Sequence, residues 1–204
     1  MNGVCIVQGA SRGIGLEFVR QLAARGERVI ATCRSPGRAD ALQALAAANH
    51  VRVLALDLED ERPIEAAAAE VDGEISLLIN AAGLLHDGEL QPEKKLAHVD
   101  PASLQRVFAV NAYGPLLMAK HFASKLPRRE RAVFASLSAR VGSIGDNRLG
   151  GWYAYRASKA AQNMFTKNLA IELGRRHKGL AVIALHPGTV RTDLSAPFRS
   201  NVPE

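Results

Sequence analysis

Apolar and polar positions divide the chain into two alternating kinds of segment. Short continuous apolar runs, typical of buried parallel strands, fall at residues 4–7, 28–33, 51–56, 75–79, 131–137 and 180–185. Apolar residues at helical spacing predict helices at residues 13–24, after Ser35-Pro36-Gly37, from 101 to about 125, and from around Tyr155 to about 177. Asp100 and Pro101 are suited to cap and begin the third helix.

Strands that alternate with helices predict an α/β fold. Continuous apolar strands need helices on both faces, so we expect a doubly wound parallel sheet of the Rossmann type. The length of 204 residues suggests that residues 1–204 form a single domain. Hydrophobic residues make up 48% of the chain, which is enough for a substantial core.

The chain lacks the marks of a secreted or membrane protein. No apolar run approaches the roughly 20 residues of a membrane span, and the first residues do not resemble a signal peptide. A cytoplasmic protein with no membrane partner is expected. Cys5 and Cys33 each lie in an apolar run and are interpreted as reduced, buried thiols. The six histidines have no ligand-like spacing, so no metal site is predicted.

The net charge of +6 raises the question of nucleic-acid binding. The basic residues are spread over helix ends and loops, and only 5% of residues are aromatic, so stacking platforms for bases are lacking. We therefore expect no nucleic-acid partner. Part of the positive charge can instead serve an anionic cofactor.

A glycine-rich turn joins the first strand to the first helix. Glycines there let the backbone approach a pyrophosphate, to which a helix N-terminus offers free N–H groups and the positive end of its dipole. The strand–turn–helix context strengthens this interpretation, since an ordinary tight turn needs fewer glycines. The expected cofactor-binding residues are Gly9, Ser11, Arg12, Gly13, Ile14 and Gly15.

The end of the second strand indicates which dinucleotide is bound. An NAD-binding protein usually places an acid there for the ribose hydroxyls, but residues 31–35 contain none. Arg34 and Arg12 would instead flank a 2′-phosphate, which favours NADP(H) over NAD(H). The alternative is that both arginines are plain surface charges.

Tyr155 and Lys159 are four residues apart in a predicted helix, which places them on one face. A positive charge beside a phenol favours the phenolate and lowers the pKa of the tyrosine from about 10. A tyrosine adjusted in this way can donate a proton to a carbonyl or accept one from an alcohol. The alternative is an ordinary solvated helix face.

These features, with several more in the same order, resemble the classical short-chain dehydrogenase/reductase family over nearly the whole chain. The resemblance implies a single NAD(P)-binding Rossmann domain and makes Asn111 catalytic beside Tyr155 and Lys159. Its further cofactor-binding positions are Asp57 and Leu58 at the adenine, Asn80, Ala81, Ala82 and Gly83 after the fourth strand, and Pro187, Gly188, Thr189, Val190 and Thr192 around the nicotinamide carboxamide. Residues 142–159 are similar, more narrowly, to C-factor and sniffer-type carbonyl reductases.

As the resemblance implies, Tyr155 would act as general acid in reduction and as base in oxidation. Lys159 would lower its pKa and bind the nicotinamide ribose, and Asn111 would hold a water that links Lys159 to solvent. The substrate would be a small aldehyde or ketone, reduced reversibly to an alcohol with NADP(H). The alternative function is an NADP(H)-binding regulatory or signalling protein with little or no catalysis.

Two positions depart from the family pattern. Gln8 stands where the family commonly has threonine, and we expect local repacking there rather than loss of the cofactor. Counting back from Gly142 puts Ala139 in the position of the catalytic serine. We favour Ser138 for that role, with Ser143 as the alternative. If neither hydroxyl reaches the carbonyl, the lost donor would slow catalysis by on the order of 10²–10³.

Family members continue past residue 204 to a last strand and helix. The chain is therefore expected to be truncated before them, or to be followed by residues that this sequence does not include. Family resemblance also implies a homodimer or homotetramer, in which helices like the one bearing Tyr155 pair between subunits. Small residues on that helix, such as Ala157 and Ala161, could equally pack against the sheet.

Overall fold

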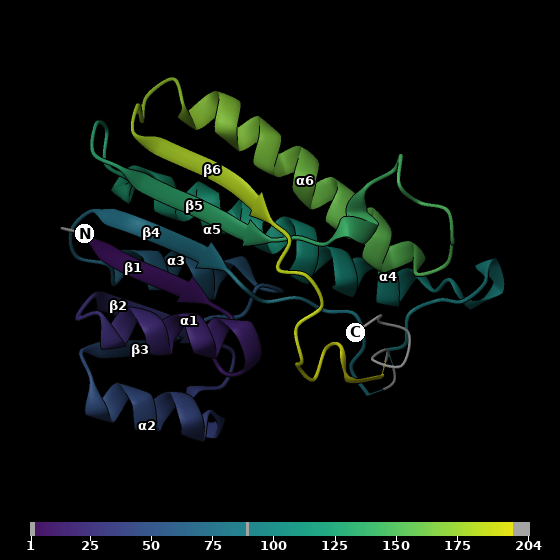
Figure 1. The fold of residues 1–204 in the computed structure, drawn as a ribbon, viewed down its shortest axis with the longest axis horizontal. Coiled ribbons are helices and arrows are strands. Elements are labelled where there is room, and N and C mark those ends of the chain that lie inside the picture. The colour runs from purple at the N-terminus through teal and green to yellow at the C-terminus, as the bar shows by residue number, and fades with distance from the viewer. Residues whose placement is uncertain (1–2, 89, 198–204) are drawn as a thin grey trace.

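A six-stranded parallel sheet organises the chain (Figure 1). The computed structural model describes residues 3–88 and 90–197. In order across the sheet, the strands are β3 (Val51–Ala55), β2 (Arg28–Cys33), β1 (Val4–Gln8), β4 (Ile75–Asn80), β5 (Ala132–Leu137) and β6 (Leu180–Leu185). The strand order runs outward from β1 and β4, so these two meet at the switch point, where doubly wound sheets bind ligands. The predicted fold class is confirmed.

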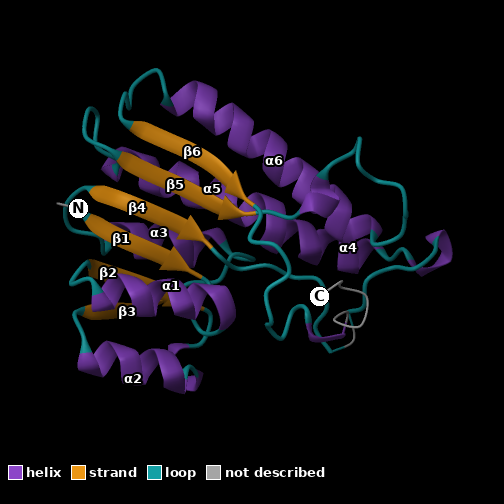
Figure 2. Ribbon diagram, in the orientation of Figure 1, coloured by secondary structure: helices purple, strands orange, loops and turns teal. Residues whose placement is uncertain are grey.

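Helices cover both faces of the sheet. They are α1 (Gly13–Ala24), α2 (Asp40–Ala48), α3 (Glu61–Ala69), α4 (Pro101–Phe108), α5 (Gly114–Phe122) and α6 (Tyr153–Leu173). Figure 2 shows α1 in front of the sheet and α3 and α5 behind it. None of the helices in the described part of the chain combines the length and apolar character that crossing a bilayer requires.

Two separate cores explain why the strands are apolar without alternation. Val4 and Ile6 of β1 belong to a core that also contains apolar residues of α3, α5 and α6. Cys5 and Val7 point to the opposite face and belong to a core with α1 and α2. Because successive strand residues point to opposite faces, each of residues 4–7 of β1 had to be apolar. Cys5 and Cys33 are buried free thiols, as predicted.

The long helix predicted from residue 101 is present but contains a π-helical turn at Ala109–Tyr113. It begins as predicted, because Asp100 Oδ2 accepts a hydrogen bond of 2.8 Å from the N–H of Ser103. Pro115 has no N–H to donate to the carbonyl four residues earlier. The ladder widens there, and the N–H of Gly114 reaches the carbonyl of Ala109.

Other boundaries differ slightly from the prediction. The last helix ends at Leu173 rather than near residue 177, because residues 174–176 form a turn. Strand β6 lies at the edge of the described sheet, and Ala181 and Ile183 are exposed along it. The expectation about how the chain ends concerns residues 198–204 and lies outside the described residues.

Candidate active site

The turns that follow β1 and β4 are in direct contact. The N–H of Ala81 donates to the Gln8 carbonyl at 2.9 Å, and the N–H of Ala82 donates to Gln8 Oε1 at 3.3 Å. A Cβ on Gly9 would lie 2.5 Å from the backbone nitrogen of Ala82, so no larger residue fits there. The Gln8 side chain is buried, and its amide oxygen links the two turns.

The glycine turn has the shape of an anion cradle. Gly9 and Gly13 have φ values of 80° and 56°, which other residues rarely adopt. A Cβ on Gly15 would lie 2.2 Å from the Gly9 carbonyl oxygen. Arg12 precedes α1 in extended conformation, and its side chain does not cap the helix. The first N–H groups of α1 are therefore a candidate site for the pyrophosphate of a dinucleotide.

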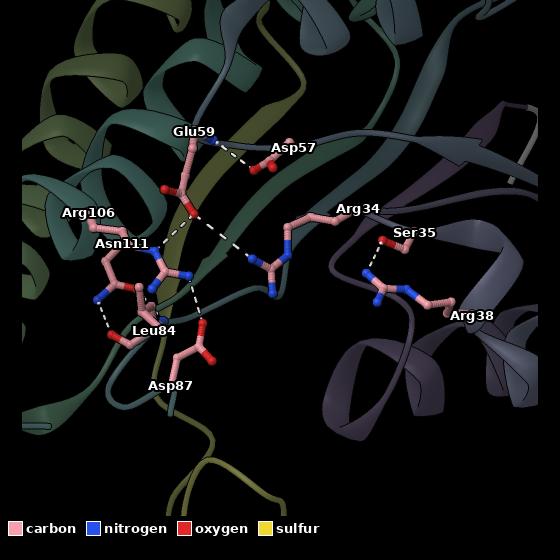
Figure 3. Close-up of polar contacts among 9 residues, drawn as sticks. All are labelled: Arg34, Ser35, Arg38, Asp57, Glu59, Leu84, Asp87, Arg106 and Asn111. Atoms are coloured by element: carbon pink, nitrogen blue, oxygen red, sulfur yellow. Dashed lines mark hydrogen bonds and ion pairs between the residues drawn. The ribbon is translucent and has the colours of Figure 1, made fainter. Parts of the chain in front are cut away.

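An acid that sequence reasoning did not foresee lies beside Arg34. Glu59, which follows β3, has its carboxylate 3.9 Å from the Arg34 guanidinium and 3.5 Å from that of Arg106 (Figure 3). Arg106 in turn lies 2.6 Å from Asp87. The adjacency of β2 and β3 brings Arg34 and Glu59 together. Arg34 is still 58% exposed, so its guanidinium is open to a further anion.

Arg12, the other predicted phosphate ligand, pairs with a different acid. Its guanidinium lies 3.2 Å from Asp193, in the segment after β6, and both side chains are exposed. The same segment touches the glycine turn, because Thr192 Cγ2 would lie 3.3 Å from a Cβ on Gly13. Ser195 Oγ donates to the Val190 carbonyl at 2.6 Å and shapes this segment. The predicted carboxamide segment thus adjoins the predicted pyrophosphate turn.

The predicted adenine pair, Asp57 and Leu58, follows β3. Asp57 Oδ1 accepts a hydrogen bond of 3.0 Å from the N–H of Glu59. Leu58 is buried against α5, since a Cβ added to Gly114 would lie 2.8 Å from the Cβ of Leu58. At the end of β4, Asn80 Nδ2 donates to Ser136 Oγ at 3.0 Å, and its Oδ1 has no partner within the described residues.

Tyr155 and Lys159 lie together and are buried, so the alternative of a solvated helix face is wrong. Their relative exposures are 8% and 2%, and the Lys159 ammonium is 5.9 Å from the centre of the Tyr155 ring. Trp152 meets the same ring edge-on, with centroids 6.2 Å apart. Lys159 Nζ donates to the Leu137 carbonyl at 2.7 Å and to Gln162 Oε1 at 2.9 Å.

Burial shifts the pKa values of Tyr155 and Lys159, and for Tyr155 the shift is opposite to the one expected from the sequence. Desolvation lowers the pKa of Lys159 to about 7, although both its acceptors favour the ammonium. Desolvation also raises the pKa of Tyr155 to about 12, whereas the sequence predicted a lowered pKa. Removal of the phenol from water is the cause of this rise. Tyr155 is therefore a phenol at neutral pH, which suits a proton donor.

Asn111 lies in the π-helical turn and is fully buried. Its Oδ1 accepts from the N–H of Leu84 and its Nδ2 donates to the Leu84 carbonyl, both at 2.8 Å. Nδ2 also donates to Ser158 Oγ at 3.1 Å. A Cβ on Gly83 would lie 3.8 Å from Asn111 Oδ1 and 4.0 Å from Lys159 Nζ. The structure thus brings Gly83, Asn111 and Lys159 together.

The serine candidates have partners within the protein. Ser138 Oγ donates to Asn163 Oδ1 at 2.7 Å, and its N–H donates to the Leu185 carbonyl at 2.7 Å. Ser143 Oγ accepts from the N–H of Asp146 at 3.3 Å. Ser138 does lie directly after β5, as expected, but its hydroxyl is held by α6. The catalytic role of either serine stays a prediction.

Two buried polar residues near the pair were missed. Glu93, from the loop before α4, accepts from the N–H of Ala154 with both carboxyl oxygens at 3.3 Å and so caps α6. Its carbonyl accepts from the N–H of Trp152 at 2.6 Å, and Trp152 is held in the left-handed region with φ of 51°. No sequence signal linked this loop to α6. The position of Gln162 beside Lys159 could have been predicted from the sequence, because residues three apart lie on one face of a helix.

Comparison with known proteins gives consistent matches. A sequence profile described as short chain dehydrogenase matches residues 3–203. The 1-hydroxy-2-glutathionyl-2-methyl-3-butene dehydrogenase of Rhodococcus sp. strain AD45 is 36% identical over 196 residues, covering 95% of this chain and 80% of that protein. Carbonyl reductase Sniffer of D. melanogaster has a TM-score of 0.83 at 27% identity, covering 95% and 83% of the two chains. An NADPH-bound carbonyl reductase from chicken fatty liver has a TM-score of 0.79 at 32% identity, covering 93% and 80%.

Replacing Glu93 by alanine should destabilise the protein, because α6 loses the acceptor at its N-terminus. We expect the free energy of unfolding to fall by about 1–2 kcal/mol, measured by urea denaturation. Glu93→Gln retains one acceptor oxygen and should lose less. Glu65→Ala, at an exposed position of α3, is the control and should stay within about 0.5 kcal/mol of wild type. Equal effects of Glu93→Ala and Glu65→Ala would contradict the cap.

The burial of Lys159 should make stability depend on pH. The folded chain releases this proton near pH 7, whereas the unfolded chain keeps it to about 10.5. Between these values the unfolded chain binds more protons, so the free energy of unfolding should rise by about 1.4 kcal/mol per pH unit. In Lys159→Met this contribution should vanish. The measurement is the difference between the two proteins at pH 7, 8 and 9, and a difference that does not change with pH would refute the assignment.

Proposed function

The chain belongs to the short-chain dehydrogenase family, and from this we propose that it reduces an aldehyde or ketone to an alcohol with NADPH, reversibly. The family is one of oxidoreductases. The observation that carries the finer proposal is the buried pair of Tyr155 and Lys159, with the phenol protonated at neutral pH. A protonated phenol in a dry site is a competent general acid for a carbonyl oxygen.

The proposed proton transfer follows from the groups present. When bound, the nicotinamide would supply the hydride that adds to the carbonyl carbon. Tyr155 would donate its phenolic proton to the carbonyl oxygen and become a phenolate. The Lys159 ammonium, 5.9 Å from the centre of the ring, would stabilise that negative charge in a medium of low polarity. In the reverse direction, the phenolate would take the proton from the alcohol.

Asn111 is proposed to act mainly by position. Its side-chain amide is already engaged with Leu84 and Ser158, so it ties the π-helical turn to the β4 turn and to α6. The role of holding a water would then fall to its backbone carbonyl, to which Pro115 cannot donate. A water there could carry protons between Lys159 and solvent.

The serine at the reacting oxygen is the weakest part of the constellation. We propose Ser138, which would have to turn its hydroxyl away from Asn163 to reach a substrate. This commitment of Ser138, and the methyl group of Ala139 beside it, favour the second candidate function. That candidate is an NADP(H)-binding regulatory protein with little catalysis.

NADP(H) is proposed over NAD(H) because Arg34 follows β2 and no acid lies on that strand end. Glu59 opposes this preference, since its carboxylate would compete with a 2′-phosphate for the Arg34 guanidinium. Arg106 offsets part of that effect, because it binds the same carboxylate. The balance leaves an exposed cation where a 2′-phosphate would lie.

A homodimer or homotetramer is part of the same proposal. Helix α6 exposes Met164 by 60% and Ile171 by 51%, and exposed apolar side chains of this size are suited to an interface. The same helix carries Tyr155 and Lys159 on its buried side. Pairing through the exposed side of α6 would therefore stabilise the helix that carries the active-site pair.

Tyr155→Phe should abolish turnover while leaving cofactor binding intact, because it removes one acidic proton and almost no volume. With a panel of aldehydes and ketones, we expect NADPH consumption to fall by about 10²–10⁴-fold. Tyr153→Phe is the matched control, since Tyr153 is a 41% exposed phenol on the same helical turn, and it should stay near wild type. Tight NADPH binding by a wild type that turns over no substrate would favour the regulatory function instead.

Arg34→Ala should reduce the preference for NADPH, because the 2′-phosphate loses a charge-assisted partner. We expect the ratio of kcat/KM for NADPH to that for NADH to fall by about ten- to hundredfold. Glu59→Gln should raise this ratio, because Arg34 loses its competing carboxylate. Arg62→Ala removes an exposed arginine paired with Asp60 nearby and should leave the ratio unchanged. A ratio that does not respond to Arg34 would disprove the assignment.

A further inference from the structure

The buried face of α6 is polar, which is the reverse of an ordinary amphipathic helix. Residues at helical spacing along this face are 0–8% exposed; they are Tyr155, Ser158, Lys159, Gln162 and Thr166. Buried polar groups must find hydrogen-bond partners, or they cost stability. Tyr155 and Lys159 have roles in the proposed reaction, whereas Gln162 takes no part in the proton transfer described above.

Gln162 closes a triangle of hydrogen bonds around the Lys159 ammonium. Its Oε1 accepts from Lys159 Nζ at 2.9 Å, and its Nε2 donates to the Leu137 carbonyl at 3.3 Å. The same carbonyl accepts from Lys159 Nζ at 2.7 Å. A leucine would fill the place of Gln162 sterically, but it would leave the ammonium with the Leu137 carbonyl alone. The amide therefore supplies a second acceptor to a charge that is 2% exposed.

Within the described part of the chain, few other charged groups face the ammonium. On α6 itself, Tyr155 is the titratable group that faces it. The end of β5 offers a carbonyl, and the π-helical turn and the β4 turn offer the neutral Asn111 and Gly83. The turn after β5 packs on α6, but its Arg140 is 80% exposed and lies 3.4 Å from Asp146. Gln162 is thus a neutral group in a position where one charge would be felt strongly.

We propose that Gln162 is a positioning residue that holds Lys159 in place as an ammonium and, through it, sets the proton balance of Tyr155. The proposal rests on the proposed function of that pair. An acceptor at 2.9 Å favours the charged form of the lysine against burial. Without it, the ammonium would release its proton at lower pH, and the Tyr155 phenolate would lose its neighbouring cation.

Two substitutions of similar volume act in opposite directions. Gln162→Leu removes the acceptor and should lower the pKa of Lys159 by about one unit, the size expected for one hydrogen bond to a charged group. Gln162→Glu adds a carboxylate and should raise it by at least as much. General damage to the fold would not shift the pKa in opposite directions. Thr166→Val is the control, because the Thr166 hydroxyl donates to the backbone carbonyl of Gln162 and the substitution leaves the Gln162 side-chain amide in place.

The first readout needs neither cofactor nor substrate. In protein labelled with ¹⁵N-lysine, the Nζ signal of Lys159, assigned by its absence in Lys159→Met, is followed from pH 5 to 10 by NMR. We expect the midpoint to move down in Gln162→Leu, up in Gln162→Glu, and to stay in place in Thr166→Val. An unchanged midpoint in both Gln162 variants, or shifts of the same sign, would overturn the inference. If Gln162→Leu does not fold, the sign of the Gln162→Glu shift still decides.

The second readout is the pH profile of NADPH-dependent reduction. The rate should fall as pH rises through the pKa of Lys159, so this limb should move to lower pH in Gln162→Leu and to higher pH in Gln162→Glu. A limb that stays in place while the NMR midpoint moves would overturn the coupling to Tyr155. A wild type without turnover would instead refute the proposed function, and the NMR midpoints would still judge the role of Gln162.

Discussion

The ammonium of Lys159 lies out of contact with water, and a buried charge is tolerated only where hydrogen-bond acceptors surround it. That constraint shapes its neighbourhood. The last carbonyl of β5, at Leu137, accepts a hydrogen bond from the ammonium, and α6 turns a polar face inward whose Gln162 supplies a second acceptor. The sheet and α6 therefore meet through hydrogen bonds at one end and through apolar packing at the other, where Leu173 joins the core.

Hydrogen bonds to neighbouring elements fix the other parts of the site around Lys159. Asn111 ties the π-helical turn to Leu84 and to Ser158 on α6. Glu93 fixes the first turn of α6 through the N–H of Ala154. Ala154, next to the phenol, also belongs to a further small apolar cluster with Leu84 and Val107, so the site is held in place before a substrate binds. Such preorganisation is what electrostatic stabilisation of a transition state requires, because no reorientation is then needed during reaction.

The sequence predicted the sheet, the glycine turn and the Tyr155–Lys159 pair, because each depends on local spacing. Continuous apolar runs indicated strands covered on both faces, and four-residue spacing placed the two catalytic candidates on one side of a helix. Interactions between segments distant in sequence were not predictable in the same way. Glu59 meets Arg34 only because β2 and β3 are neighbours, and Glu93 meets α6 through an irregular loop. The pKa of Tyr155 was predicted in the wrong direction because spacing reveals a neighbouring charge but not the depth of burial.

The π-helical turn at residues 109–113 is in effect one extra residue within a helix. The wider turn absorbs that residue locally, whereas an extra residue in an ordinary helix would rotate everything after it by about 100°. Met118 and Phe122 of α5 therefore still face the core. Deleting one residue of the turn would restore an ordinary helix and leave α5 packed, but it would remove the widened backbone that displays Asn111. The active site, more than the core, is what depends on this extra residue.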